Sequence, residues 1–384
     1  MNILEEIQNC PVEWKELGEV CSVNKGKQLN KNLLIDDGLY PAYNGGQTYS
    51  GRTNDYNVEA NTIIVSQGGA SAGFVNFVET KFWANAHCYY ILPDETQVKN
   101  RFVYHFLKMN QKYLMDFQHG AGIPALKSDK LTKLLIPVPP IKTQEKIVQI
   151  LDKFTNYVTE LTSELTSRKK QYSFYRDKLL SFEDEVYQVE WKKLSECLKK
   201  GKGTKITASQ MKLLHKDGAP IRIFAGGKTY ADVNYGDIPD KDIHTEEAIV
   251  VKSRGIIDFE YCTKPFSFKN EFWSYSSDNE NINLRYIYHY LVHNKEYFQN
   301  IANNMQMPQI SSNDTEKFKI PVPSLEIQSR IVQVLDNFDM VCHDLNIGLP
   351  KEIELRQKQY EYFREKLLTF VAEGEYSTVQ TRHH

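Results

Sequence analysis

Lysines in glycine-containing segments are the residues of this chain best suited to a chemical task. Residues 197–216, CLKKGKGTKITASQMKLLHK, carry six lysines and no acid, and residues 22–32, SVNKGKQLNKN, carry three lysines and no acid. Lysines neutralise phosphate charges, and small residues let a backbone approach a phosphate closely. A lysine run is commonly a solvated surface, but its presence in both halves of the chain favours contacts with a nucleic-acid backbone.

Glycine-rich polar loops with amides and aromatics form a second group: AYNGGQTY, SQGGASAG, FWANAH and QHGAGIPALK. Asn, Gln, Ser, Arg and Lys side chains can hydrogen-bond to base edges in a major groove, although turn chemistry also explains any single one. From both groups we expect the following DNA-binding residues: Lys25, Lys27, Asn44, Gln47, Arg52, Ser66, Gln67, Asn85, His87, His119, Lys127, Lys200, Lys202, Lys205, Lys228, Lys252, Ser253, Arg254, Asn304, Gln306 and Gln309.

The search for a catalytic site gives no convincing candidate. The GGKT segment at residues 226–229 lacks the first glycine of a phosphate-binding loop, because that position is Arg222. The segment PDETQVK at residues 93–99 carries the residue types of a nuclease site but falls in an apparent turn. No H-E-x-x-H or Asn-Pro-Pro-Tyr run is present, and the six cysteines include no C-x-x-C pair. We therefore expect no catalytic residue and no metal site in this chain.

The composition is that of a globular protein with more than one domain. The 384 residues are 41% hydrophobic and 25% charged, and no apolar run is long enough for a membrane span. The N-terminal MNILEEIQNC has acids where a secretion signal has bases, so we expect a cytoplasmic location. With a net charge of −2, a nucleic-acid binder would have to concentrate its lysines on one face.

The sequence segments that must form the elements positioning these loops occur twice in the chain. IPVPPIKTQEKIVQILDKF from Ile136 and IPVPSLEIQSRIVQVLDNF from Ile320 share eleven of nineteen residues. The match continues through VEWKEL and VEWKKL, through RFVYHFLKMNQKYL and RYIYHYLVHNKEYF, and through RKKQYSFYRDKLLSF and RQKQYEYFREKLLTF. The chain is therefore two copies of one unit, each with a globular part followed by a helical part.

Both helical parts carry the apolar seam of a coiled coil. From Ile147 to Phe182 the seam advances by alternating steps of four and three residues, with Arg168 at its one polar position, which is the pattern of a left-handed supercoil. The second copy begins likewise at Ile331, but it has four additional residues around Gly348 and Pro350, where we expect a kink or a break. Two seams in one chain predict that the helices pack antiparallel and relate the halves by a pseudo-two-fold axis.

The globular parts have the pattern of strands joined by turns. Runs rich in Val, Ile, Tyr and Phe include NTIIVSQ, GFVNFVE and CYYIL in the first part, and EAIVVKS and IIDFEY in the second. Gly, Asn and Asp separate them. One helix is expected in each part, at residues 102–113 and 286–298. The predicted fold class is α+β: two mixed α/β domains with mostly antiparallel sheets, separated by two long helices packed as an antiparallel coiled coil.

With these motifs the chain resembles a type I restriction–modification specificity subunit. The two IPVP segments resemble the starts of that family's two helical regions, and KQYSFYRDKLLSF and KQYEYFREKLLTF resemble their ends. The residues that match the family's pattern at the helix starts are Pro137, Pro139, Gln144, Ile147, Leu151, Phe154, Pro321, Pro323, Gln328, Ile331, Leu335 and Phe338. For the spacer helices and their contacts with partners we also expect Leu161, Leu165, Tyr172, Tyr360 and Phe363.

The repeat and the resemblance together divide the chain. Target-recognition domain 1 is expected at residues 1–140, spacer helix 1 at 141–184, domain 2 at 185–324, spacer helix 2 at 325–372 with a kink near 348–350, and a tail at 373–384. The resemblance implies that each domain recognises half of a bipartite, asymmetric site in double-stranded DNA. It implies two methyltransferase subunits that carry S-adenosylmethionine, and endonuclease subunits that use ATP and Mg. It also implies that this chain is non-catalytic and binds no cofactor itself.

Two other interpretations are compatible with the sequence. The chain could be a stand-alone DNA-acting enzyme with a cryptic site, in which case it would cut or modify DNA alone. It could instead be a coiled-coil adaptor that binds only protein, in which case it would show no salt-dependent DNA binding even with partners present.

A tandem tetrapeptide, TELTSELT at residues 159–166, lies on the first spacer helix. Four residues lengthen an α-helix by about 6 Å, while B-DNA rises about 3.4 Å per base pair. We therefore expect that one tetrapeptide more or less changes the gap between half-sites by about one or two base pairs.

Overall fold

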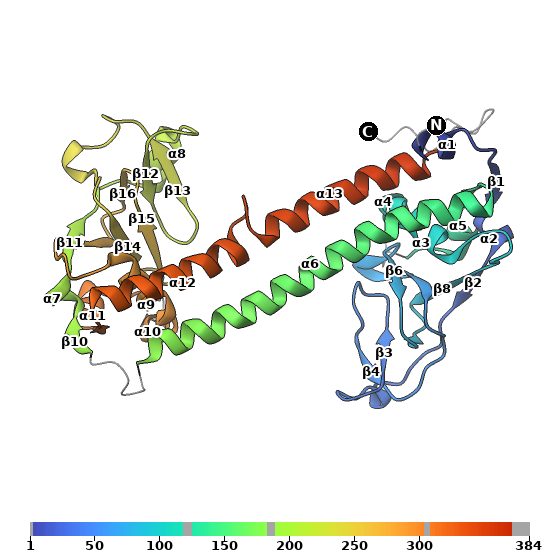
Figure 1. Ribbon diagram of the computed structural model, residues 1–384, viewed down its shortest axis with the longest axis horizontal. Helices are drawn as coiled ribbons and strands as arrows, with labels where there is room; N and C mark the ends of the chain where they lie inside the picture. Colours follow the sequence, from blue (N-terminus) through green and yellow to red (C-terminus); the bar gives the residue numbers. More distant parts are fainter. Residues whose placement is uncertain (1–2, 118–124, 183–188, 303–307, 371–384) are drawn as a thin grey trace. The chain divides into compact units, whose positions relative to one another are not determined.

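The duplication seen in the sequence is a duplication of structure. The computed structural model describes residues 3–117, 125–182, 189–302 and 308–370. Its contacts divide the chain into two units: unit 1 comprises Met1–Thr162 with Glu352–His384, and unit 2 comprises Ser163–Lys351. Each unit holds one globular domain and one stretch of each helical part, with corresponding strands and helices in the same order (Figure 1).

Domain 1, in unit 1, is built on a four-stranded antiparallel sheet in the order β2 (Cys21–Lys25), β8 (Cys88–Pro93), β5 (Thr62–Ser66), β6 (Val75–Val78). A smaller sheet has the order β4 (Gly51–Thr53), β3 (Tyr40–Tyr43), β7 (Trp83–Ala84), with β3 and β7 parallel. A separate pair joins β1 (Glu13–Glu16) to β9 (Leu135–Val138). The helices are α1 (Ile3–Gln8), α2 (Leu17–Val20), α3 (Asn100–Met109), α4 (Gln111–Asp116) and α5 (Ser128–Thr132), with 3-10 turns η1 (Lys31–Leu33) and η2 (Gly69–Ser71).

Domain 2, in unit 2, repeats this plan. Its four-stranded sheet has the order β11 (Lys199–Lys202), β17 (Trp273–Ser276), β14 (Ala248–Lys252), β15 (Asp258–Cys262), and its smaller sheet the order β13 (Tyr230–Val233), β12 (Ile221–Phe224), β16 (Phe266–Phe268). The separate pair joins β10 (Glu190–Lys193) to β18 (Lys319–Val322). The helices are α7 (Leu194–Cys197), α8 (Ala208–Leu214), α9 (Leu284–His293), α10 (Lys295–Ala302) and α11 (Ser312–Glu316), with the 3-10 turn η3 (Asp240–Asp242).

The central strand of each large sheet is buried on both faces. β5 reads TIIVS and β14 reads AIVVK, and every residue of both strands is buried. Ile63 and Val65 pack in the cluster that contains Phe102 of α3, while Ile64 packs in the cluster of the smaller sheet. A continuous apolar run is expected when both faces of a strand are covered.

The repeated VEWK and IPVP segments pair with each other in both domains. Trp14 lies opposite Pro137 in the β1–β9 pair, and Trp191 lies opposite Pro321 in the β10–β18 pair. Proline is tolerated because each pair is a two-stranded edge. The spacer helices begin three residues after these pairs, α6 (Ile141–Ser181) after β9 and α12 (Leu325–His343) after β18. The paired segments therefore fix where each helix leaves its domain.

The helical parts pack antiparallel within each unit, as the seam predicts. In unit 1 the ring of Phe154 on α6 stacks on Phe363 of α13 (Leu349–Leu368), with 5.2 Å between centroids, and the guanidinium of Arg356 lies over Tyr157. In unit 2 Tyr175 of α6 stacks on Phe338 at 5.8 Å, and Tyr172 lies edge-on to His343 at 5.6 Å. In both units the residue numbers rise along α6 while they fall along its partner. The α+β fold class with an antiparallel helix pair is therefore confirmed.

The second helical part is broken between α12 and α13. The chain leaves the helix after His343 and re-enters it at Leu349, with Pro350 in the first turn. A side chain at Gly348 would collide with the carbonyl oxygens of Met340 and Asp344, so this tight turn requires glycine. Asp344 accepts hydrogen bonds from the backbone of Asn346 and Ile347 and closes the turn. None of the described helices combines the length and apolarity needed to cross a membrane.

Candidate nucleic-acid interface

Four loops of domain 1 meet at one end of the large sheet. We call residues 44–47, 66–69, 85–88 and 125–127 the first loop cluster. The backbone N–H of Gln67 donates to the carbonyl oxygen of His87 at 2.8 Å, and that of Leu126 donates to the carbonyl oxygen of Gln67 at 2.7 Å. Gly68 and Ala125 form a β-bridge. Segments far apart in the sequence are thus held together by backbone hydrogen bonds. Such bonds do not depend on which side chains the segments carry.

The loop that contains the NGGQ segment joins the same cluster through its glycines. The N–H of Gly45 donates to the Cys88 sulfur at 3.1 Å, and Gly46 accepts from the Ser66 hydroxyl at 3.3 Å. Gly45 has a φ of +80°, and a Cβ there would lie 2.9 Å from the His87 carbonyl oxygen. Glycine is therefore needed both for the backbone conformation and for the close approach.

Domain 2 has a matching set, residues 225–228, 252–255, 269–271 and 308–310, which we call the second loop cluster. The N–H of Ile310 donates to the Ser253 carbonyl oxygen at 3.0 Å, as Leu126 does to Gln67. Arg254 and Gln309 form the bridge that corresponds to Gly68 and Ala125. Gly69 and Gly255 occupy equivalent turns with the same φ of +74°. The backbone frame of the two clusters is therefore repeated.

The predicted DNA-binding residues divide into exposed and buried sets. Exposed residues in the two clusters are Asn44, Gln47, His87, Lys127, Lys228 and Arg254. Gln67 and Gln309 are partly exposed, and the Gln67 amide donates to the Tyr89 hydroxyl at 3.0 Å. These eight side chains are brought together in two groups, one in each domain.

Four predicted residues are buried and have partners within the protein. The Ser66 hydroxyl donates to Gly46, and the Ser253 hydroxyl donates to the Glu271 carbonyl oxygen at 2.8 Å. Asn85 accepts hydrogen bonds from two backbone N–H groups, and the Lys252 ammonium lies 2.5 Å from Glu260 with only 4% of the side chain exposed. These side chains hold the loops in place, because buried polar groups require such partners. In this structure Ser66, Asn85, Lys252 and Ser253 therefore stabilise the loops that carry the exposed side chains.

Arg52 is partly exposed and also has partners within the protein. Its guanidinium donates to the carbonyl oxygens of Gly38 at 2.6 Å and Leu39 at 2.9 Å. Arg52 thus braces a turn at the edge of the smaller sheet. His119, Asn304 and Gln306 lie outside the described residues.

The lysine segments lie beside the clusters, but their glycines serve packing. Gly26 donates to the Cys88 carbonyl oxygen at 2.9 Å, and a Cβ on Gly26 would collide with the backbone of Ala84 and Asn85. The small residue of the KGK motif is therefore required by close packing against the backbone of Ala84 and Asn85. The lysines differ in what they contact. Lys25, Lys27, Lys202 and Lys205 are exposed, whereas the Lys200 ammonium lies 2.5 Å from Glu316.

Comparison with known proteins identifies the repeated unit. The family described as "Type I restriction modification DNA specificity domain" matches residues 11–168 and again residues 188–355. The chain belongs to this family. The specificity subunit of the EcoR124I/EcoR124II type I restriction enzyme of Escherichia coli is 31% identical, and the alignment covers 96% of this chain and 97% of that one.

Two solved structures share the fold of this specificity-domain chain. The S subunit of a type I restriction–modification system from M. genitalium has a TM-score of 0.70 at 22% identity, covering 95% of this chain and 98% of that one. A chain from a structure on complex assembly and conformational transition of the type I R-M system has a TM-score of 0.53 at 14% identity, covering 94% and 98%. At these identities the likeness supports the fold alone.

The specificity-domain fold places the expected helix residues at the bases of the domains. Ile147, Leu151, Ile331 and Leu335 are buried in the domain cores, and Gln144 and Gln328 are fully buried. Leu161, Leu165, Phe154, Phe338, Tyr172, Tyr360 and Phe363 are partly buried along the helices. The ion pairs of Arg101 with Asp152 and of Arg285 with Asp336 are not among the contacts predicted from the sequence. The signal was present, because Arg101, Asp152 and their counterparts recur at the same offset in the two copies.

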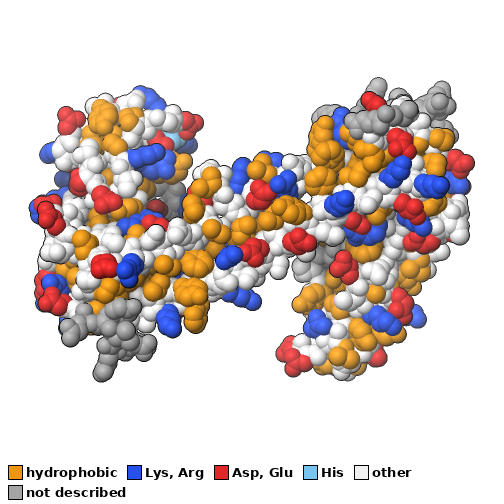
Figure 2. Space-filling model, viewed as in Figure 1, with side chains coloured by type: hydrophobic (Ala, Val, Ile, Leu, Met, Phe, Trp, Pro, Cys, Tyr) orange, Lys and Arg blue, Asp and Glu red, His pale blue; other side chains and the backbone are white. Residues whose placement is uncertain are grey.

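Charge is spread over this specificity-domain chain. Figure 2 shows basic and acidic side chains interspersed on the visible face of both domains and of the helices. This distribution fits the net charge of −2. The exposed Lys and Arg side chains of the loop clusters, Lys127 in the first and Lys228 and Arg254 in the second, are therefore electrostatic features available for binding.

Proposed function

We propose that this chain is the non-catalytic DNA-specificity subunit of a type I restriction–modification complex. Each loop cluster contacts one half of a bipartite, asymmetric site in double-stranded DNA, and the paired helices space the two domains. Two methyltransferase subunits that carry S-adenosylmethionine dock on the helices and domains, and endonuclease subunits that use ATP and Mg join them. The complex acts on DNA in the cytoplasm.

One observation carries the proposal: the two loop clusters share a backbone frame but differ in their side chains. The same backbone bond places Gln67 in one cluster and Ser253 in the other, and equivalent bridges place Gly68 and Arg254. Phosphate contacts position a protein, while side chains at base edges select a sequence. A repeated frame with different side chains is what two unlike half-sites require.

The exposed side chains have suitable chemistry for both kinds of contact. Amides such as Gln47 and Gln67 can pair with the edge of adenine, and an arginine such as Arg254 can pair with guanine. Lysines beside the clusters can neutralise phosphates without reading sequence. In the proposal the phosphate contacts come from Lys25, Lys27, Lys127, Lys202, Lys205 and Lys228, all of which are exposed.

The near-neutral net charge of this chain supports the idea that its partner subunits make most of the contacts with DNA phosphates. Non-specific DNA affinity comes from the number of phosphates that cations neutralise. With a net charge of −2, this chain supplies few of those contacts alone. In the proposal the methyltransferase subunits provide most of the surface that holds the DNA, and the isolated chain binds DNA weakly.

Mapping modified adenines across a genome tests the proposal. A strain with the gene should carry methylation at one bipartite motif with a fixed gap, and a strain without the gene should lose methylation at that motif only. Methylation that is unchanged by the deletion would refute the proposal. DNA cleavage or modification by the purified chain alone would favour a stand-alone enzyme. Absence of salt-dependent DNA binding by the complex with methyltransferase would favour a protein-only adaptor.

A further inference from the structure

In both units an Arg–Asp–His cluster ties a helix of the domain to the spacer helix that leaves it. In unit 1 Asp152 of α6 lies 2.5 Å from Arg101 Nη2 and 2.8 Å from His105 Nε2, and both of these residues are on α3. In unit 2 Asp336 of α12 lies 2.9 Å from Arg285 and 2.7 Å from His289, both on α9. The two clusters match residue for residue.

A buried glutamine makes a second tie of the same kind in each unit. The Gln144 side chain accepts from the Lys99 backbone at 2.8 Å and donates to the carbonyl oxygens of Gln97 at 2.9 Å and Pro139 at 2.8 Å. Gln328 repeats these bonds at 2.8, 3.0 and 2.8 Å, to Asn283, Asn281 and Pro323. Each amide therefore joins the start of the domain helix to the start of the spacer helix.

A tyrosine from the opposite spacer helix completes each junction. In unit 1 the Tyr360 hydroxyl of α13 lies 2.9 Å from His105 Nδ1. In unit 2 the equivalent Tyr172 of α6 lies near Asp339 on α12, three residues after Asp336, and its ring packs against Phe338 at 5.9 Å. An arginine lies over each tyrosine ring, Arg364 at 5.0 Å and Arg176 at 5.8 Å. Each junction thus connects the domain to both helices of the pair.

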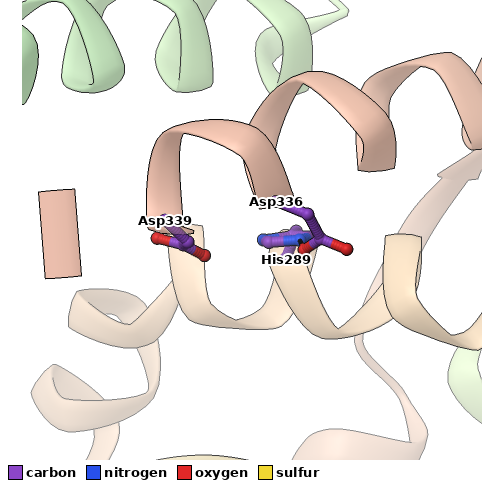
Figure 3. Close-up of side chains that lie close together, drawn as sticks. All are labelled: His289, Asp336 and Asp339. Atoms are coloured by element: carbon purple, nitrogen blue, oxygen red, sulfur yellow. Dashed lines mark hydrogen bonds and ion pairs between the residues drawn. The ribbon is translucent and has the colours of Figure 1, made fainter. Parts of the chain in front are cut away.

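The cluster in unit 2 also has the composition of a metal site, but its contacts argue otherwise. Figure 3 shows His289 of α9 beside Asp336, with Asp339 farther along α12. Asp336 is already paired with the Arg285 guanidinium, whose positive charge opposes a cation. In unit 1 the place of Asp339 is taken by Thr155, whose hydroxyl donates to the backbone. A shared structural role therefore explains both copies better than a metal in one.

We infer that these residues are positioning residues: they set the angle between each recognition domain and the helix pair, and thereby the gap between half-sites. The inference rests on the proposed function. Apolar contacts are not directional, so the core of Ile147 and Leu151 alone would tolerate small rotations of the domain. Directional bonds from a polar network with buried histidine and glutamine side chains and partly exposed Arg–Asp pairs specify one arrangement. That network recurs in both units, whereas the loops it supports differ.

Two variants of the complete complex with methyltransferase test this inference. Asp152→Asn removes the charge that holds Arg101 and His105, and Tyr360→Phe removes only the hydroxyl that reaches His105. Sequencing of methylated sites should show unchanged half-site bases. The share of sites whose gap differs by one base pair should rise about tenfold, the selectivity that one hydrogen bond to a charged group supplies. Asp116→Asn, in an exposed ion pair on α4, and Tyr362→Phe, on the exposed face of α13, should leave the gap unchanged.

The outcomes separate a positioning role from a merely structural one. A lower melting temperature with an unchanged gap distribution in both variants would overturn the inference. If Asp152→Asn does not fold, the gap distribution of Tyr360→Phe decides, because the phenylalanine keeps the ring in place. A wild-type complex that methylates no bipartite motif would instead refute the proposed function itself. A fixed gap in the wild-type complex together with a broadened gap in Tyr360→Phe supports both.

Discussion

Arg254 occupies in the second loop cluster the place that Gly68 occupies in the first. Both residues form the β-bridge to the segment that follows the domain helices, Gly68 with Ala125 and Arg254 with Gln309. The Arg254 side chain is exposed, while neighbouring cations are engaged, Lys252 with Glu260 and Lys269 with Glu271. An arginine on a fixed backbone loop is suited to direct recognition of a base.

Replacing this arginine should therefore relax one position of one half-site. Arg254→Lys keeps the charge but loses the planar pair of donors that matches guanine, so the discrimination at that position should fall by about 1–3 kcal/mol. Methylation-site sequencing should show one base of one half-site become degenerate, while the other half-site is unchanged. Arg330→Lys, at an exposed ion pair on α12, is the control. A uniform loss of methylation at all sites would show that Arg254 contacts only the backbone of DNA.

Lys228 should act through charge alone. It is exposed in the glycine-rich loop of the second cluster, whereas Lys200 lies 2.5 Å from Glu316 and is already neutralised. For the complex, Lys228→Gln should weaken binding to all sequences alike and reduce the slope of log K against log salt by about 1. Lys200→Gln should change the slope less, as measured by titration at several salt concentrations. Equal slopes for the two variants would contradict a phosphate contact at Lys228.

The tandem tetrapeptide predicts a change of gap without a change of half-sites. Residues 159–166 lie within α6, a continuous helix from Ile141 to Ser181. Deleting four of them shortens the helix by about 6 Å, equivalent to about one or two base pairs of B-DNA at about 3.4 Å each. Methylation-site sequencing should return the same half-sites with a gap shorter by that amount. An unchanged gap would show that the helix does not set the distance.

Residues with local patterns were predictable, and residues whose role depends on distant partners were not. The seam from Ile147 and the break near Gly348 follow from periodicity and from turn chemistry. Lys252 and Asn85 lie in polar loops by sequence, yet they are buried because Glu260 and two backbone N–H groups satisfy them. Likewise Lys200 lies in a lysine-rich run but pairs with Glu316 across 116 residues. No local sequence pattern encodes such pairings. The DNA-binding residues predicted from residue types alone therefore included side chains that have partners within the protein.

The buried histidines of the junctions predict a loss of stability in mild acid. Burial lowers the pKa of His105 and His289 below the ordinary 6.5, although the hydrogen bonds that these histidines donate to Asp152 and Asp336 act in the opposite direction. The unfolded chain therefore binds more protons than the folded chain as the pH falls from about 7 to about 5, and stability falls with it. Burial of Asp152 opposes its ionisation, but hydrogen bonds from His105 and Arg101 outweigh this and lower its pKa below 3.8. The stabilising contribution of Asp152 is therefore kept in this window.

Thermal unfolding at pH 7 and at pH 5.5 measures this effect. His105→Gln should lose part of the pH dependence, up to about 1.4 kcal/mol per pH unit, because glutamine does not titrate. Identical pH profiles for the wild type and for His105→Gln would mean that His105 binds its proton equally well in the folded and unfolded states. In that case the junction would be as stable with a charged histidine as with a neutral one.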